Sequence, residues 1–311
     1  MPDTPILHST GLDYFVADVF TETPLKGNPL AVVMNTCGLE TAQMQAIARE
    51  FNLSETAFVE RKAAEVERME GVRVRIFTAQ EELPFAGHPT LGTASVLAEF
   101  APETLREGTV TLAEKVGPIP VRFERRANST GLFGEMTQRD PEFGAGLDAR
   151  EIAPLLGLAA ADLDPALTPQ VVSTGNPFAI VVLRSVEALE RLKVDQEAST
   201  AWLRERAARW FYVLAPNPDQ DQGLTQWQFR ARMQFNGGED PATGSAAGCA
   251  ISYLVAYGVV RPNTRVHLRQ GVEIGRPSDI FLSARKEMAR VTDVRVAGST
   301  VLVAKGQLFQ P

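Results

Sequence analysis

With 311 residues, 44% of them hydrophobic and 22% charged, the chain has an ordinary globular composition and is long enough for one large domain or two smaller ones. A net charge of −7 and an isoelectric point near 5.2 argue against a nucleic-acid partner, which would favour a basic surface. The sequence has no apolar run long enough for a bilayer, no signal-peptide pattern and only two cysteines, so we expect a cytoplasmic protein without a disulfide framework or a membrane partner.

In the first half, short apolar or alternating runs bounded by turn residues predict strands at 14–20, 30–35, 56–61, 72–78 and 119–125. Between the second and third of these, Met44, Ile47, Ala48 and Phe51 have the spacing of an amphipathic helix that covers a sheet. The helix predicted at 89–100 differs because most of it carries no charge. A helix without a polar face is typical of a buried position.

The second half repeats this plan, with strands predicted at 171–174, 178–183, 210–214 and 227–235. Outer helices are expected at 186–192 and 199–208, an uncharged helix at 244–257, and further strands up to residue 309. The motif GNPLAVV at Gly27 returns as GNPFAIV at Gly175, and the turns before the two uncharged helices also resemble each other. Two ordered repeats predict two homologous domains that face each other across a cleft.

We place the domain boundary between 128 and 167, where Asn, Gly, Asp and Pro cluster. The expected domains are 1–128 and 129–298, and the last strand, 299–311, is expected to return to the first domain.

The two uncharged helices begin with turns rich in Gly and Thr, and unpaired N–H groups at such helix ends bind carboxylates. If both ends face one cleft, they form a carboxylate cradle; the alternative is that they are simply tight turns that lead into core helices. The expected donors are Gly87, His88 and Thr90 on one side and Thr243, Gly244 and Ser245 on the other.

Two further residues stand at these helix ends. Asp240 precedes the second uncharged helix, where it either caps the helix or reaches the cleft, while Glu239 is expected to face solvent. His88, between Gly and Pro, is a candidate proton carrier or hydrogen-bond donor. His8 and His267 are not expected to take part, and no His or Cys has the spacing of metal ligands.

From the residues alone, Glu55 at the start of a strand is interpreted as solvent-facing. Cys249, on an apolar helix, is interpreted as a small core residue, and Cys37 has no evident partner. GxGxxG, P-loop, GxSxG and HExxH motifs are absent, so no nucleotide or metal cofactor is expected.

The blocks GNPLAVV, LSETAFV, FAGHPTLGTA, GNPFAIV and GEDPATGSAAG, in this order, resemble the PhzF-like phenazine-biosynthesis isomerase family, which is related to diaminopimelate epimerase. The resemblance implies an α+β fold of two pseudo-symmetric domains, each a curved, mostly antiparallel sheet around a central helix. It also implies an active site in the cleft between the domains, no cofactor, and a homodimer.

In this family the Glu of the LSET motif is the catalytic acid/base, so the resemblance makes Glu55 the main candidate instead of a surface residue. It assigns His88 of the GHP motif and Asp240 of the EDPATGS motif to the same site. By the same resemblance, the substrate-binding residues are Ser54, Gly87, Gly244 and Ser245. The epimerase relatives use two cysteines at the helix ends; Ala86 and the Cys-free DPATGS stand there in this chain, so a two-thiol mechanism is not expected.

The resemblance therefore implies an isomerase that moves a proton between carbons of a small carboxylate-bearing substrate. The prototype shifts hydrogen from C3 to C1 of trans-2,3-dihydro-3-hydroxyanthranilate. Glu55 would remove and return the proton, while His88 and Asp240, the other two catalytic candidates, would bind the amine or hydroxyl and assist proton movement. Two alternatives stay open: an epimerase or racemase that uses Glu55 and Asp240 as two bases, and a binding protein that keeps the cleft without turnover.

Overall fold

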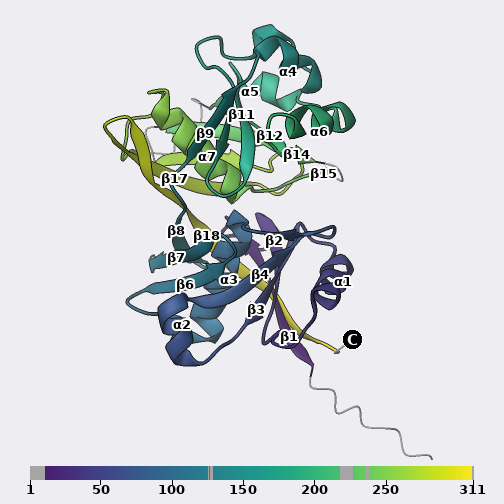
Figure 1. The fold of residues 1–311 in the computed structure, drawn as a ribbon, viewed down its shortest axis with the longest axis vertical. Helices are drawn as coiled ribbons and strands as arrows, with labels where there is room; N and C mark the ends of the chain where they lie inside the picture. Colours follow the sequence, from purple (N-terminus) through teal and green to yellow (C-terminus); the bar gives the residue numbers. More distant parts are fainter. Residues whose placement is uncertain (1–10, 125, 127–128, 218–226, 236–237, 310–311) are drawn as a thin grey trace, which may run out of the picture.

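The computed structural model places the chain in two lobes that lie end to end, connected by strands (Figure 1). It describes residues 11–124, 126, 129–217, 227–235 and 238–309. The helices are α1 (Thr41–Phe51), α2 (Ala64–Glu70), α3 (Gly87–Phe100), α4 (Ala149–Leu155), α5 (Val186–Glu190), α6 (Gln196–Arg204) and α7 (Gly244–Ala256), with 3₁₀ turns η1 (Pro102–Thr104) and η2 (Ala160–Asp162).

The strands from β1 to β8 belong to the first lobe, those from β9 to β17 to the second, and β18 to both. They are β1 (Leu12–Val19), β2 (Asn28–Val33), β3 (Glu55–Glu60), β4 (Val72–Phe77), β5 (Glu82–Leu83), β6 (Thr109–Glu114), β7 (Gly117–Glu124), β8 (Leu132–Thr137), β9 (Glu142–Gly146), β10 (Gln170–Ser173), β11 (Pro177–Val182), β12 (Trp210–Pro216), β13 (Trp227–Arg232), β14 (Gln234–Phe235), β15 (Gly238–Glu239), β16 (Val266–Gln270), β17 (Ser278–Glu287) and β18 (Arg290–Leu308).

The two lobes share one order of strand pairing. In the first, β2 and β3 are parallel across α1, β4 and β6 are parallel across α3, and the remaining pairs are antiparallel. In the second, β11 and β12 are parallel across α5 and α6, β13 and β16 are parallel across α7, and the other main pairs are antiparallel. The predicted duplication of a mostly antiparallel sheet is therefore confirmed.

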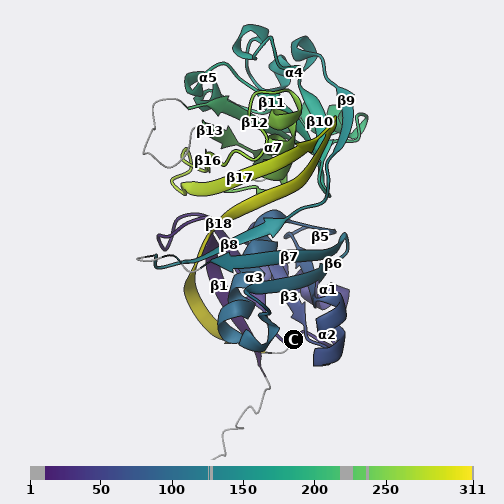
Figure 2. The same cartoon turned by 90° about the vertical axis from the view of Figure 1, so that its left-hand side faces the viewer.

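Strand β18 joins the lobes. Its first part pairs with β17, its middle with β8, and its last part, from Thr300 onward, with β1. Figure 2 shows the strand passing from one lobe into the other. This pairing closes the sheet of the first lobe into a ring of strands. The domain boundary expected after residue 128 lies outside the described residues and stays a prediction.

The two uncharged helices lie inside the lobes, as expected. Every residue of α3 from Gly87 to Leu97 and of α7 from Gly244 to Val255 is buried. Strands β1, β2, β6 and β8 surround α3, while β10, β11, β17 and β18 pack on α7. Their small side chains let the curved sheets approach closely, so most of the core lies between each helix and its sheet. Among the described residues, no helix is both long and apolar enough to cross a membrane.

The region between 128 and 167 contains more regular structure than its turn residues predict. Strands β8 and β9 and helix α4 lie there. All residues of β9 are exposed and two of them are glycine, so the strand has no apolar alternation that would reveal it. Helix α4 begins at Ala149 after Asp148, whose side chain accepts a hydrogen bond from the backbone of Arg150.

One buried carboxyl group lies against the first turn of α3. The Thr90 hydroxyl is 2.7 Å from the carbonyl oxygen of Ala86 and 2.6 Å from Oε1 of Glu114. A hydroxyl has one hydrogen, so it donates to only one of these two acceptors at a time; when Glu114 carries a proton, Glu114 can donate to Thr90 while the hydroxyl donates to Ala86. Burial raises the pKa of Glu114 to about 8, which favours this neutral form.

This geometry predicts a pH-dependent loss of stability that Glu114→Gln removes. Since the folded pKa lies above the unfolded value of 4.5, the native state binds the extra proton, and its stability falls as pH rises from about 4.5 to about 8. The variant should lack this slope in urea unfolding and be more stable than the parent above pH 8. The exposed Glu142→Gln serves as control; equal slopes in parent and Glu114→Gln would contradict the prediction.

Candidate active site

The N-terminal ends of α3 and α7 touch each other between the lobes. A Cβ atom on Gly87 would lie 2.4 Å from the backbone nitrogen of Ser245 and 2.5 Å from the carbonyl carbon of Gly244. A Cβ atom on Gly244 would lie 3.0 Å from Cζ of Phe20 and 3.2 Å from backbone atoms of Gly87. The two helix ends come this close because both positions are glycine.

Backbone donors concentrate at this contact. The first bonds within the helices are Thr90 N–H to Ala86 O (3.1 Å) in α3 and Ala247 N–H to Thr243 O (2.9 Å) in α7. The preceding amides have no acceptor within their helices: these are Gly87, His88, Gly244, Ser245 and Ala246. With the positive ends of two helix dipoles, they favour an anion here.

The prediction is wrong for two of the backbone donors expected in this cradle. The N–H of Thr90 is engaged in the helix, and the N–H of Thr243 donates to Oε1 of Gln270 at 3.1 Å. The donors that are left come from both helices.

Glu55 begins β3 and lies beside His88 of α3. Its Oε2 is 3.4 Å from the imidazole Nε2, and the Glu55 and His88 side chains are 16% and 3% exposed. The interpretation of Glu55 as solvent-facing is therefore wrong. The alternation of residues along a strand does not show which side of a lobe packs against the other lobe. Glu55 is buried because it lies on that side.

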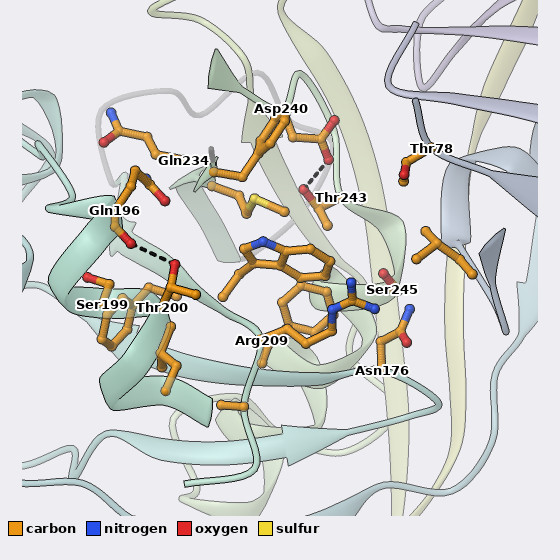
Figure 3. A pocket seen from close by; sticks show the side chains of 18 of the residues that line it. Thr78, Asn176, Gln196, Ser199, Thr200, Arg209, Gln234, Asp240, Thr243 and Ser245 are labelled. Carbon is orange, nitrogen blue, oxygen red and sulfur yellow. Dashed lines mark hydrogen bonds between the residues drawn. The ribbon is translucent and has the colours of Figure 1, made fainter. Parts of the chain in front are cut away.

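Asp240 of the second lobe reaches the same place. The amide nitrogen of Asn28 lies 2.7 Å from Oδ1 of Asp240 and 3.1 Å from Nδ1 of His88. The hydroxyl of Thr243 donates to Oδ2 of Asp240 at 2.5 Å, as drawn in Figure 3. Ser54 also hydrogen-bonds Asp240. Thr243, rather than Asp240, occupies the N-cap position of α7.

Burial shifts the pKa values of these three groups in different directions. It raises the pKa of Glu55 well above its usual value, with the charge of Asp240 as the second cause. It lowers the pKa of His88 to about 3, so the imidazole is neutral at physiological pH. It raises the pKa of Asp240 to about 6, against the opposing effect of hydrogen bonds led by that from Thr243. Neighbouring titratable groups whose pKa values are shifted apart are typical of acid/base sites.

A buried amide behind the site fixes Asp240 and Thr243. Nε2 of Gln270 donates to the carbonyl of Asp240 (2.8 Å) and to the hydroxyl of Thr243 (3.0 Å), while its Oε1 accepts from Tyr212 at 2.9 Å. Sequence reasoning missed Gln270, because a single glutamine at the end of a strand that alternates apolar and polar residues carries no signal. Its counterpart at the front, Asn28, belongs to a motif that was noticed only as a repeat.

A cavity of about 490 Å³ opens in front of this cluster, lined by Glu55, Asp240 and Ser245 among others. Figure 3 shows Arg209 extending into it from the second lobe, opposite Thr78 of the first. The Arg209 guanidinium lies over the Trp210 ring, 4.4 Å from its centre, and pairs with Glu81 of the first lobe. An ion pair therefore bridges the lobes beside the cavity.

Other predicted positions lie apart from the cluster. Glu239 does not face solvent as expected: it pairs with Arg232 at 2.6 Å and its side chain is 7% exposed. Cys249 is a buried thiol in the core of α7, and burial raises its pKa to about 12. The exposed Cys37 donates to the carbonyl of Arg61.

The remaining histidines have no role at this cluster in the described part of the chain. His267 pairs with Asp279 at 2.8 Å, and His8 lies outside the described residues. No group of three or more His, Cys, Asp or Glu side chains that could hold a metal ion occurs within the described ranges.

Comparison with known proteins places this chain in a family. The model of the family "Phenazine biosynthesis-like protein" matches residues 17–306. Trans-2,3-dihydro-3-hydroxyanthranilate isomerase of Pseudomonas fluorescens is 35% identical over 300 residues, which cover 95% of this chain and 99% of that protein. The crystal structure of a Bacillus anthracis phenazine biosynthesis protein of the PhzF family is 26% identical, with a TM-score of 0.82 over 96% of this chain and 99% of that one.

A more distant similarity concerns the fold alone. The structure of a probable proline racemase from Agrobacterium radiobacter is 12% identical, with a TM-score of 0.62 over 96% of this chain and 92% of that one. The expected epimerase-like fold is thus confirmed.

The contact of the helix ends makes Gly87→Ala a sharp test of the site geometry. The new methyl group would meet backbone atoms of Gly244 and Ser245, which cannot rotate away, so the helix ends must separate. We expect a loss of about 1–3 kcal/mol or more in the free energy of unfolding, measured with urea. Gly146→Ala is the control, since its Cβ would meet only Thr168 Cγ2 at 3.5 Å; equal stability of both variants would refute the close approach.

Proposed function

The chain belongs to the phenazine biosynthesis-like family and is an isomerase, and we propose that it moves a proton between carbons of a small carboxylate-bearing substrate with Glu55 as acid and base. The observation that supports this role is the position of Glu55: a buried carboxyl oxygen with no hydrogen-bond partner, in the cavity and beside a neutral imidazole. A group with these properties is free to take a proton from a bound carbon acid.

The proposed reaction has two proton transfers and no net change in protons. The Glu55 carboxylate removes hydrogen from one carbon, and the electron pair of the broken C–H bond enters the conjugated system of the substrate. The helix ends at Gly87 and Gly244 bind the substrate carboxylate and stabilise the negative charge that develops there. Glu55 then returns the proton to a second carbon. Its raised pKa suits both steps, because the group has to accept a proton and release it.

The named activity of the Pseudomonas fluorescens relative supports a proposal for the substrate class. We propose an unsaturated carboxylic acid with an amine or hydroxyl substituent, like dihydro-hydroxyanthranilate, and Asp240 as the group that binds this substituent. The homodimer implied by the resemblance stays a prediction for this chain.

The pseudo-symmetry of the lobes argues against the alternative of a two-base epimerase. The register pairs Leu30 with Glu55 in the first lobe, and Phe178 with Trp210 in the second. Leu30 and Phe178 occupy the same position of the repeated motif, so Trp210 is the counterpart of Glu55. A second base is thus missing from the symmetric position, and both oxygens of Asp240 already accept hydrogen bonds.

We expect Glu55→Gln to lower turnover by about 10²–10⁴-fold, because the amide cannot accept the proton. The measurement is product formation from a dihydro-hydroxyanthranilate in heavy water, with deuterium located in the product by NMR. Glu142→Gln, at an exposed position of the second lobe, should keep full activity. Unchanged turnover in Glu55→Gln would exclude the proposed role, while deuterium at the α-carbon of an unrearranged acid would indicate an epimerase.

The charge of Asp240, the second cause of the Glu55 pKa shift after burial, should contribute to the pH dependence of the reaction. The carboxylate of Glu55 is the form that starts the reaction, so kcat/KM should rise with pH through the raised pKa of Glu55. Asp240→Asn removes the charge that contributes to this shift, so the acidic limb of the profile should move to lower pH even though the rate falls. An acidic limb that stays in place would contradict the coupling. His88, with its pKa near 3, should add no inflection between about pH 5 and 9.

A further inference from the structure

The repeated Gly-Asn-Pro motif forms a pair of clamps between the lobes. The amide nitrogen of Asn28 in the first lobe donates to the carbonyl of Ala242, two residues before the start of α7, at 2.8 Å. The amide nitrogen of Asn176 in the second lobe donates to the carbonyl of Phe85, two residues before the start of α3, at 2.7 Å. Each asparagine thus holds the turn that leads into the central helix of the opposite lobe.

The two clamps differ in what else they touch. Nδ2 of Asn28 also lies 2.7 Å from Oδ1 of Asp240 and 3.1 Å from Nδ1 of His88. Among the described residues, the side chain of Asn176 has the bond to Phe85 and reaches no titratable group. Asn28 is fully buried, so water does not compete for these contacts.

The two hydrogens on the Asn28 amide determine whether Nδ1 of His88 can carry a hydrogen. An amide nitrogen carries two hydrogens, and the Asp240 carboxylate and the Ala242 carbonyl are acceptors. These two nearer atoms take both hydrogens. Turning the amide over would place its oxygen against the same two acceptors, so the orientation is fixed. A hydrogen on Nδ1 of His88 would point at this occupied NH₂ group and be repelled.

We propose that Asn28 is a positioning residue that holds His88 in the tautomer with its hydrogen on Nε2, directed toward Glu55. In the structure, Nε2 of His88 and Oε2 of Glu55 lie 3.4 Å apart, and neither has a hydrogen-bond partner within the described part of the chain. His88 is then a neutral donor whose hydrogen is available to charge that develops on Glu55 and the substrate during the reaction, rather than a carrier of protons. Its lowered pKa agrees with a neutral ring. The kinetic consequence rests on the proposed function of Glu55, whereas the tautomer is a property of the resting protein.

The test is ¹⁵N NMR of protein labelled at histidine, in which protonated and unprotonated ring nitrogens have distinct shifts. Three histidines are present, and His88→Gln identifies the signals of His88. We expect an unprotonated Nδ1 and a protonated Nε2 from about pH 5 to 8. The titratable groups that face the ring and its partners are Glu55 of β3, Asp240 before α7 and Tyr212 of β12, which acts through Asp240. A protonated Nδ1 in the parent protein would overturn the proposal.

Asn28→Asp tests the cause, because it replaces the NH₂ group by an acceptor of nearly the same shape. We expect the hydrogen to move to Nδ1 and kcat to fall by about 10–100-fold, the range for groups that orient a reacting residue. Asn176→Asp introduces the same charge in the symmetric clamp and should leave the His88 tautomer unchanged. An unaltered tautomer in Asn28→Asp would also overturn the proposal.

If Asn28→Asp does not fold, Asn28→Ala removes the donor without adding charge. We expect a mixture of both tautomers in that variant, and a single unchanged tautomer would count against Asn28. Since these spectra are recorded without substrate, they are independent of the turnover of Glu55→Gln, so failure of the tautomer and failure of the proposed reaction are separately visible.

Discussion

The contact between Gly87 and Gly244 is the constraint on which the rest of the structure depends. Two central helices that pointed at a common gap from a greater distance would leave room for a side chain between them, and their free N–H groups would bind water instead of one shared anion. With no Cβ on either residue, the helix ends meet backbone to backbone. This contact fixes the distance between the lobes, so Asp240 of the second lobe lies within reach of Asn28 of the first, which also contacts His88.

The same burial that allows this contact also tunes the chemistry. A site of low polarity opposes charge of either sign, so it raises the pKa of a carboxyl group and lowers that of an imidazole. Glu55, whose Oε2 has no hydrogen-bond partner, shows the rise without compensation, while Asp240 is moderated by the donors Thr243, Asn28 and Ser54. The pKa values of the two carboxyl groups thus differ because of their hydrogen bonds rather than their distance from solvent. This difference suits Glu55 for the proposed proton transfer and Asp240 for the proposed binding.

Patterns within one segment predicted much of the fold, and patterns between segments were harder. The helices α3 and α7 were predicted because burial on all sides leaves most of each helix without charge. Glu239 and Glu55 were misjudged from the residues because their partners, Arg232 and His88, come from other strands or helices. Gln270 gave no signal for the same reason: it acts through contacts with Tyr212 and the backbone of the Asp240 turn, and no local spacing encodes these.

Symmetry in the backbone combined with asymmetry in the side chains explains how a duplicated fold can support a single acid/base group. Both lobes keep the elements that build the cleft: the asparagine clamps, the glycine at each helix end and the parallel strand pairs. At equivalent places the side chains diverge. Trp210 of the second lobe occupies the position equivalent to Glu55 of the first. Ser245, next to Gly244, is likewise equivalent to His88, next to Gly87. In the proposed reaction one lobe contributes the proton-transfer group and a neutral imidazole, and the other contributes an aromatic wall and a hydroxyl. A site of this kind can remove and return a proton on one face of a flat substrate. Inverting a stereocentre would require a second base on the opposite face, where this chain has placed an indole.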